Sequence, residues 1–122
     1  MVALTGQTVL ITGASSGLGE QLALAVAAKG ANVVLAARRQ DRLTKVAAQC
    51  RRVSRAQAVA IKCDLAQVSE IDRLFDQVDQ LFGSLDIVIN AAGFGILTPA
   101  IDMDAATMAK LLRVNTLAVM LV

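Results

Sequence analysis

The chain has 122 residues with a net charge of +2, and 56% of its residues are hydrophobic. That length predicts a single domain, residues 1–122, that buries roughly two-thirds of its unfolded surface. The weak positive charge and an aromatic content of 2% argue against a nucleic-acid-binding face, which combines clustered cations with stacking rings. No apolar run approaches the roughly 18 residues of a membrane span, and the N-terminus is not built like a signal peptide. We therefore expect a cytoplasmic protein that binds neither nucleic acid nor membrane.

Several residue types used in catalysis are missing. The sequence contains no His, Tyr or Trp, so neither an imidazole nor a phenol can move a proton here. Its two cysteines, Cys50 and Cys63, are widely spaced and predict neither a zinc site nor a disulfide framework. We expect both thiols to be small buried hydrophobic groups, and we expect no bound metal.

The first predicted strand, residues 8–11, leads directly into the sequence TGASSGLG at residues 12–19. Glycines between a strand and a helix let backbone N–H groups approach a diphosphate, whose charge the helix dipole favours. We interpret Gly13 as allowing the turn, Gly17 as admitting the pyrophosphate and Gly19 as permitting close packing of the helix on the sheet. The Gly-x3-Gly-x-Gly spacing differs from the commonest dinucleotide fingerprint, and the alternative is a tight turn that needs glycine only for packing.

Other residues of this loop are also expected to contact the ligand. The hydroxyls of Ser15 and Ser16 can donate hydrogen bonds to ribose or phosphate, although simple solvation of the loop is an alternative for each. Leu18, in the first turn of the helix, completes the expected set.

The remaining elements alternate along the chain. Strands are predicted over residues 32–36, 58–62 and 85–90, and helices over residues 19–29, 41–52 and 70–82, with a last helix that Asp104 opens and that runs to the end of the chain. Gly30 and Gly83 suit the left-handed positions that follow helices, and Ser69 is a plausible N-cap. The helix at 70–82 is amphipathic, and its expected buried face consists of Ile71, Leu74, Phe75, Val78 and Leu81.

This order predicts an α/β fold. Near-continuous apolar strands indicate a sheet that is covered on both faces, as in parallel α/β proteins. Long right-handed crossovers then give a partial Rossmann-type parallel sheet, with helices on both faces and strand order 3-2-1-4. A ligand is expected at the carboxyl ends of the strands. The chain ends on the apolar residues 117–122, so we expect it to be a truncated domain.

Four motifs together carry a resemblance to a known family. They are residues 12–19, Cys63-Asp64-Leu65 after the third strand, Asn90-Ala91-Ala92-Gly93 after the fourth, and Asn115 in the last helix. In order and spacing the chain resembles the N-terminal half of a classical short-chain dehydrogenase/reductase. The resemblance covers essentially all 122 residues, with one substitution in the Asn-Asn-Ala-Gly motif.

The resemblance implies roles for these residues. Asp64 would accept a hydrogen bond from the adenine amino group while the Leu65 main chain contacts a ring nitrogen; the alternative for Asp64 is to cap the turn. Asn90 would shape the strand exit so that the backbone of Ala91 to Gly93 passes beneath the ribose, unless it is purely structural. Asn115 would anchor a proton-relay water, and an asparagine within a helix also suggests a kink. Phe94 either borders a substrate cleft or packs.

The residues after the second strand favour one cofactor. NAD-binding relatives usually place a carboxylate there for the ribose 2′-hydroxyl, whereas this chain has Arg38 and Arg39. A charge-assisted contact with a 2′-phosphate contributes about 1.5–3 kcal/mol, or roughly 10- to 150-fold in affinity. We therefore predict NADP(H), with NAD(H) as the weaker ligand. The alternative is that both are solvated charges at the start of a helix, and this describes Arg39 better than Arg38.

The expected activity is hydride transfer between the nicotinamide and a small carbonyl or alcohol substrate. By resemblance, a Ser and a Tyr-x3-Lys pair would complete the catalytic set beyond the asparagine helix; this sequence has stopped before them, so we expect the isolated chain to be inactive. One alternative is a non-catalytic nucleotide-binding or regulatory module. A methyltransferase fits poorly, because such enzymes typically use Gly-x-Gly-x-Gly with an acid ending strand two.

We also expect a homo-oligomer. In the family it resembles, the asparagine helix contributes to a dimer interface. The apolar strip expected to do so here consists of Leu111, Leu112, Val119 and Leu121. The alternative is that these residues pack against a fifth strand.

Overall fold

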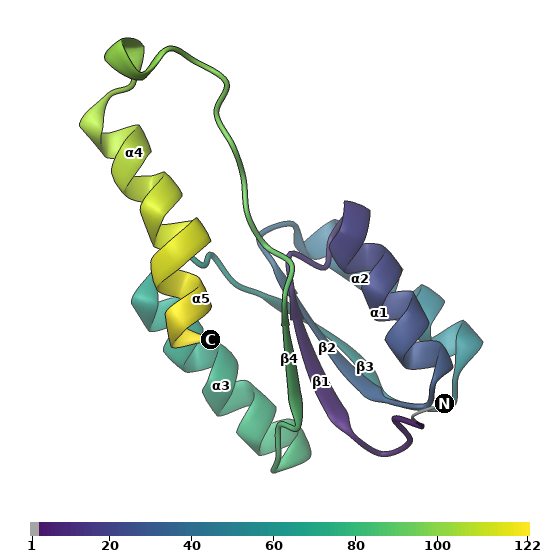
Figure 1. The fold of residues 1–122 in the computed structure, drawn as a ribbon. Helices are drawn as coiled ribbons and strands as arrows, with labels where there is room; N and C mark the ends of the chain where they lie inside the picture. Colours follow the sequence, from purple (N-terminus) through teal and green to yellow (C-terminus); the bar gives the residue numbers. More distant parts are fainter. Residues whose placement is uncertain (1–2) are drawn as a thin grey trace.

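The computed structural model describes residues 3–122 and has the α/β architecture that the sequence predicts (Figure 1). In chain order its elements are β1 (Thr8–Thr12), α1 (Gly17–Ala28), β2 (Asn32–Ala37), α2 (Gln40–Val53), β3 (Ala58–Lys62), α3 (Val68–Phe82), β4 (Ile87–Asn90), the 3₁₀ turn η1 (Ala100–Asp102), α4 (Ala105–Leu112), the π-helical segment η2 (Arg113–Leu117) and α5 (Ala118–Leu121).

The four strands form one parallel sheet in the order β3-β2-β1-β4, which confirms the predicted topology. The register places Thr12 beside Ala36 on one side and beside Asn90 on the other. Ala37 of β2 in turn pairs with Lys62 of β3. All four strands therefore end at the same edge of the sheet, where the segments that follow them come together.

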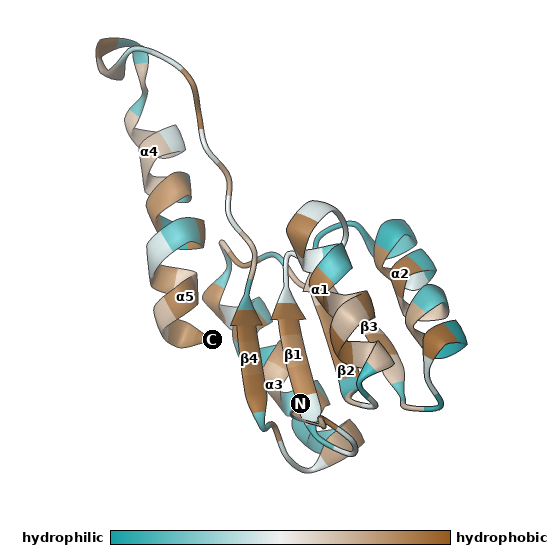
Figure 2. Ribbon diagram, turned by 45° about the vertical axis from the view of Figure 1, so that its right-hand side comes forward, coloured by the Kyte–Doolittle hydropathy of each residue, from teal (hydrophilic) through white to brown (hydrophobic). Residues whose placement is uncertain are grey.

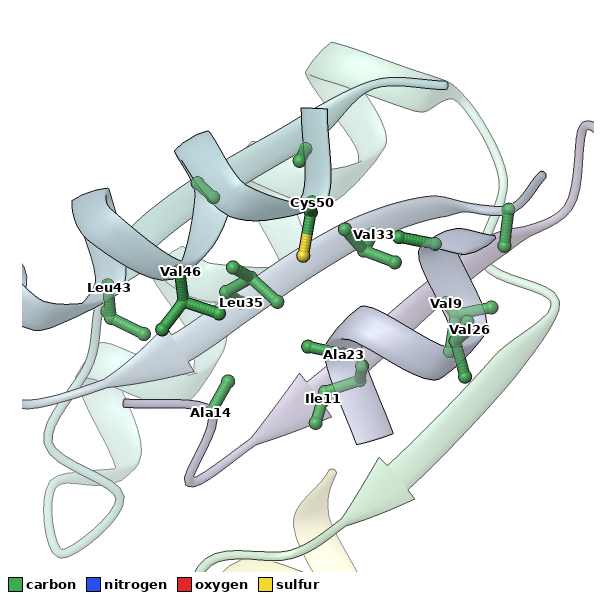
Figure 3. Close-up of a cluster of buried hydrophobic side chains, with 14 of the residues drawn as sticks. Val9, Ile11, Ala14, Ala23, Val26, Val33, Leu35, Leu43, Val46 and Cys50 are labelled. Atoms are coloured by element: carbon green, nitrogen blue, oxygen red, sulfur yellow. The ribbon is translucent and has the colours of Figure 1, made fainter. Parts of the chain in front are cut away.

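Helices cover both faces of the sheet, as the apolar strands predict; β1 and β4 are brown over most of their length in Figure 2. Helices α1 and α2 lie on one face, and α3 lies with α5 on the other (Figure 1). Because successive side chains of a strand point to opposite faces, Val9 and Ile11 enter the first core while Leu10 enters the second. Figure 3 shows the first core, where Leu35 and Cys50 fill the space between β2 and α2. The sheet therefore has a separate core on each side.

The helix ends follow local chemistry. Gly30 and Gly83 adopt φ values of 85° and 68°, the left-handed conformation predicted after α1 and α3. The Asp104 carboxylate accepts a hydrogen bond from the Thr107 backbone N–H at 2.8 Å and caps α4 as expected. The last helix is irregular, since a π-helical segment containing Asn115 separates α4 from α5.

Three local predictions were wrong. Helix α3 begins at Val68 rather than after Ser69, because its N-cap is Gln67, whose N–H donates to the Asp64 carbonyl at 2.9 Å. Leu81 is 53% exposed rather than buried, so the apolar face of α3 is buried mainly through its first three turns. Strand β4 starts at Ile87 and not at 85, because the preceding residue, Asp86, instead receives the Thr8 N–H on its carboxylate at 2.7 Å.

Candidate functional site

A cleft of about 250 Å³ lies where the carboxyl ends of the strands meet. Segments following all four strands contribute to its wall, and α4 contributes from the side. It is lined by Gly13, Ser15, Ser16, Ala37, Arg38, Arg39, Cys63, Asp64, Leu65, Ala91, Ala92, Gly93, Phe94, Lys110 and Val114. This is the location expected for a ligand of an open parallel sheet.

The glycines of the 12–19 loop are required for different reasons. Gly13 has φ +66°, and a Cβ there would lie 2.7 Å from the Cα and N of Ala92. A Cβ on Gly19 would collide with the Gly13 carbonyl, so Gly19 packs against the loop itself rather than against a strand. Gly17 has φ +58° but no atom within 4 Å of its Cβ position. The loop is therefore closed against β4 at Gly13 and open at Gly17.

Hydrogen bonds also hold this loop between the two strands that flank β1. The buried hydroxyl oxygen of Thr12 accepts from the Ala92 N–H at 3.3 Å, and the Ala14 N–H donates to the Ala36 carbonyl at 3.4 Å. The role of Thr12 in joining the first and last strands was not anticipated from the sequence. These bonds fix the position of the loop relative to the rest of the cleft.

Arg39 contacts the serines of the glycine loop. Its Nη2 atom donates to the Ser15 hydroxyl at 3.2 Å and to the Ser16 hydroxyl at 2.9 Å. Arg39 is thus more than the solvated charge considered as its alternative role, because its exposed guanidinium also joins the end of β2 to the start of α1. Arg38 lies beside it in the cleft wall, and both side chains are exposed.

The segment after β3 forms a compact turn. Asp64 Oδ1 accepts from the Ala66 N–H at 3.0 Å, and the Asp64 N–H donates to Glu70 Oε2 at 2.6 Å. The turn-capping role considered for Asp64 is thus present, while its adenine contact stays a prediction. Beside it, burial and the nearby carboxylates of Glu70 and Asp64 raise the pKa of the Cys63 thiol to about 11. The thiol is therefore protonated at neutral pH and acts as an uncharged part of the cleft wall.

Asn115 is bound to the loop after β4. Its Oδ1 accepts from the Phe94 N–H at 3.1 Å, and its Nδ2 donates to the Phe94 carbonyl at 2.7 Å. Gly93 lies close by, since a Cβ on it would sit 3.4 Å from Asn115 Oδ1. The irregularity expected at Asn115 coincides with the π-helical segment, whereas its predicted role with a relay water remains a prediction.

The cleft includes only part of the predicted set. The lining contains nine of the residues proposed from the sequence, and Gly17, Leu18, Gly19, Asn90 and Asn115 lie outside it. Sequence reasoning missed Ala37, Lys110 and Val114 as lining residues. The four-residue spacing of Lys110 and Val114 is the one sequence signal that places both on the same side of a helix.

Within residues 3–122, no helix has the length and apolar content needed to cross a bilayer. The same part of the chain contains no group of three His, Cys, Asp or Glu side chains that could hold a metal ion.

Comparison with known proteins identifies relatives of this chain in sequence and in fold. The sequence model of the short chain dehydrogenase family matches residues 7–122. An 11-beta-hydroxysteroid dehydrogenase-like 2 protein of Arabidopsis thaliana is 44% identical over 90 residues, which cover 74% of this chain and 29% of the relative. An uncharacterized oxidoreductase of Staphylococcus aureus is 36% identical over 115 residues, covering 94% of this chain and 48% of that protein. The chain thus spans about half the length, or less, of these relatives.

The similar solved structures indicate the same family as the sequence relatives. A metagenomic short-chain oxidoreductase in complex with NADP superposes with a TM-score of 0.93 at 32% identity, covering 98% of this chain and 54% of that one. L-Sorbose reductase from Gluconobacter frateurii, complexed with NADPH and L-sorbose, gives 0.93 at 28% identity, covering 98% and 45%. The chain therefore belongs to the short-chain dehydrogenase family, as its four motifs predict, and corresponds to the N-terminal half of a classical member.

Proposed function

We propose that this chain is the nucleotide-binding part of an NADP(H)-dependent oxidoreductase that acts on a carbonyl or alcohol. The observation that carries the proposal is the contact of Arg39 with Ser15 and Ser16, which brings a cation to the glycine loop. Arg38 supplies a second cation at the end of β2, in the position where a carboxylate would favour NAD(H). The NADP and NADPH held by the two structural relatives support the same assignment.

The glycine loop beside the cleft suits a dinucleotide. The space around the Cβ position of Gly17 is open, so backbone there can approach a diphosphate closely. Ser16 is the N-cap of α1 but its side chain does not cap the helix, which leaves N–H groups of the first turn available to an anion. Bound in this way, the dinucleotide would supply or accept a hydride at its nicotinamide ring. The chain itself would bind and orient it.

The isolated chain is proposed to bind without turnover. Reduction of a carbonyl needs a proton donor for the developing alkoxide, and the sequence contains neither Tyr nor His. Asn115 uses both polar atoms of its side chain to hold Phe94 and is therefore proposed to position the cleft wall in this chain. The second candidate function is a non-catalytic nucleotide-binding module. A coding sequence that continues into a Ser and a Tyr-x3-Lys motif would favour the oxidoreductase over this module.

Titration of the purified chain with NADPH and with NADH tests the cofactor assignment. We expect NADPH to bind roughly 10- to 150-fold more tightly, because the 2′-phosphate gains a charge-assisted contact. Arg38→Asp should abolish this preference, whereas the matched change Arg52→Asp, on the part of α2 remote from the cleft lining, should retain most of it. Equal wild-type affinities for the two nucleotides would refute the NADP(H) assignment, and absence of binding by a folded chain would refute the dinucleotide site.

A further inference from the structure

The cations of the cleft come from two directions. Arg38 and Arg39 lie between the end of β2 and the start of α2, on the face of the sheet that α1 and α2 cover. Lys110 comes from α4, which rises on the other side of the strand edge together with the loop after β4 (Figure 1). The only carboxylate in the lining is that of Asp64, whose Oδ1 already accepts the Ala66 N–H. The cleft therefore has an excess of positive charge that is divided between its two walls.

The helix that carries Lys110 is fixed at several points. Asp104 caps its first turn, and the paired hydrogen bonds between Asn115 and Phe94 attach its continuation to the loop after β4. One turn farther, Ala118 is 2% exposed and belongs to the core beneath α3. Val114, four residues after Lys110, also lines the cleft. The backbone thus holds Lys110 at the wall of the cleft.

The ammonium group of Lys110 is available to a ligand. The side chain is exposed, and the one ion pair found among residues 3–122 joins Arg73 to Glu70 elsewhere on the molecule. A lysine without a carboxylate partner costs little to bring to a phosphate, because no existing ion pair has to break. Its three N–H donors on a flexible stem suit a phosphate oxygen as a point charge.

We propose that Lys110 binds a phosphate group of the dinucleotide from α4, opposite Arg38 and Arg39. This inference rests on the proposed function, since it needs a dinucleotide in the cleft. It adds a second, helix-borne wall to the anion site and makes α4 part of cofactor binding. The phosphate concerned is either the diphosphate, which NADH and NADPH share, or the 2′-phosphate, which NADPH alone carries.

Isothermal titration of NADPH and NADH into Lys110→Met tests this proposal. Methionine keeps the unbranched stem and the helix propensity but removes the charge. We expect the Kd for NADPH to rise roughly 5- to 10-fold at low salt, with a smaller effect at high salt because the contact is partly screened. Lys110→Arg should stay within about twofold of the wild type, because it keeps the charge. The control is Lys29→Met, an exposed lysine after α1 that does not line the cleft, and it should leave both affinities unchanged.

The possible outcomes distinguish a failure of the inference about Lys110 from a failure of the proposed function. An equal loss for NADPH and NADH assigns Lys110 to the diphosphate, and a loss for NADPH alone assigns it to the 2′-phosphate. If the wild type binds NADPH and Lys110→Met binds it equally well, the inference about Lys110 is wrong while the proposed function stands. If the folded wild type binds neither nucleotide, the proposed function fails and the inference fails with it.

Discussion

Replacing Gly13 with alanine should destabilise the protein more than the same change at a glycine of similar φ with open space around it. Gly13 has φ +66°, and an added Cβ would meet Ala92 Cα and N at 2.7 Å and the Ala91 carbonyl oxygen at 2.8 Å. All three atoms are backbone at the exit of β4, and this backbone is fixed by strand pairing with β1 and by the Thr12 hydroxyl. The new methyl group therefore cannot be relieved by rotating a side chain.

The expected loss has two parts. The left-handed conformation costs an L-residue about 1–2 kcal/mol. Forcing an extra carbon into a packed contact typically costs about 1–3 kcal/mol more. Gly13→Ala should thus lower the free energy of unfolding by about 2–5 kcal/mol, a large share of the roughly 5–15 kcal/mol that stabilises a typical domain.

Gly83→Ala is the matched control. Gly83 has φ +68°, close to that of Gly13, but no atom lies within 4 Å of its Cβ position. It should lose only the conformational part, about 1–2 kcal/mol. Urea denaturation followed by circular dichroism measures both variants under the same conditions. Equal losses would show that contact with the β4 exit does not matter, and the assigned role of Gly13 would be wrong.

Three further results are expected. The hydrogen bonds from the Thr107 N–H and hydroxyl lower the pKa of Asp104 below 3.8, so the stability they supply is present above that pH and is lost as the pH falls through the lowered pKa. Asp104→Asn still caps the helix but does not titrate, so its free energy of unfolding should decline less steeply at acid pH than that of the wild type. Parallel declines for the two proteins would contradict this. The double change Arg52→Ser and Arg55→Ser should slow NADPH association at low salt without altering its dissociation. The reason is that residues 38–55 contain seven cations and only one acid, and this excess of positive charge attracts the anionic nucleotide. An unchanged association rate in stopped flow would exclude electrostatic steering by these residues. Leu112 and Val119 are 53% and 41% exposed, so the chain should self-associate at micromolar concentration in light scattering, and changing both to Gln should weaken this; a monomeric wild type would disprove it.

Much of the fold followed from local patterns. The apolar runs at β1 and β2, each bounded by glycine or arginine, identified strands buried on both faces, and the crossovers then fixed the strand order. The glycine loop was recognisable because its conformations are local, with positive φ at Gly13 and Gly17. In such segments neighbours in sequence impose the structure, so the sequence was sufficient to predict it.

The errors and omissions come from particular hydrogen bonds and from contacts between distant segments, which composition does not reveal. Ser69 was a reasonable N-cap by composition, but the turn at Asp64 and its bond to Glu70 begin α3 earlier. Arg39 contacts serines 24 and 23 residues away, and no local pattern indicates which of two adjacent arginines turns toward them. Lys110 reaches the cleft only because α4 folds back beside the strand ends. The position of Lys110 in the cleft wall therefore follows from tertiary packing and could not be predicted from its neighbours in sequence.

The place of β4 in the sheet has a consequence for how the protein folds. The Thr8–Asp86 and Thr12–Ala92 hydrogen bonds join residues 78 and 80 positions apart, whereas β1, β2 and β3 meet through much shorter connections. Closing the longer loop costs more chain entropy, so β4 should dock after the other three strands have assembled. Its docking also brings in Ala91, and with it one wall of the cleft. A dinucleotide would then recognise only the finished sheet, slowing its unfolding without hastening the earliest steps of assembly.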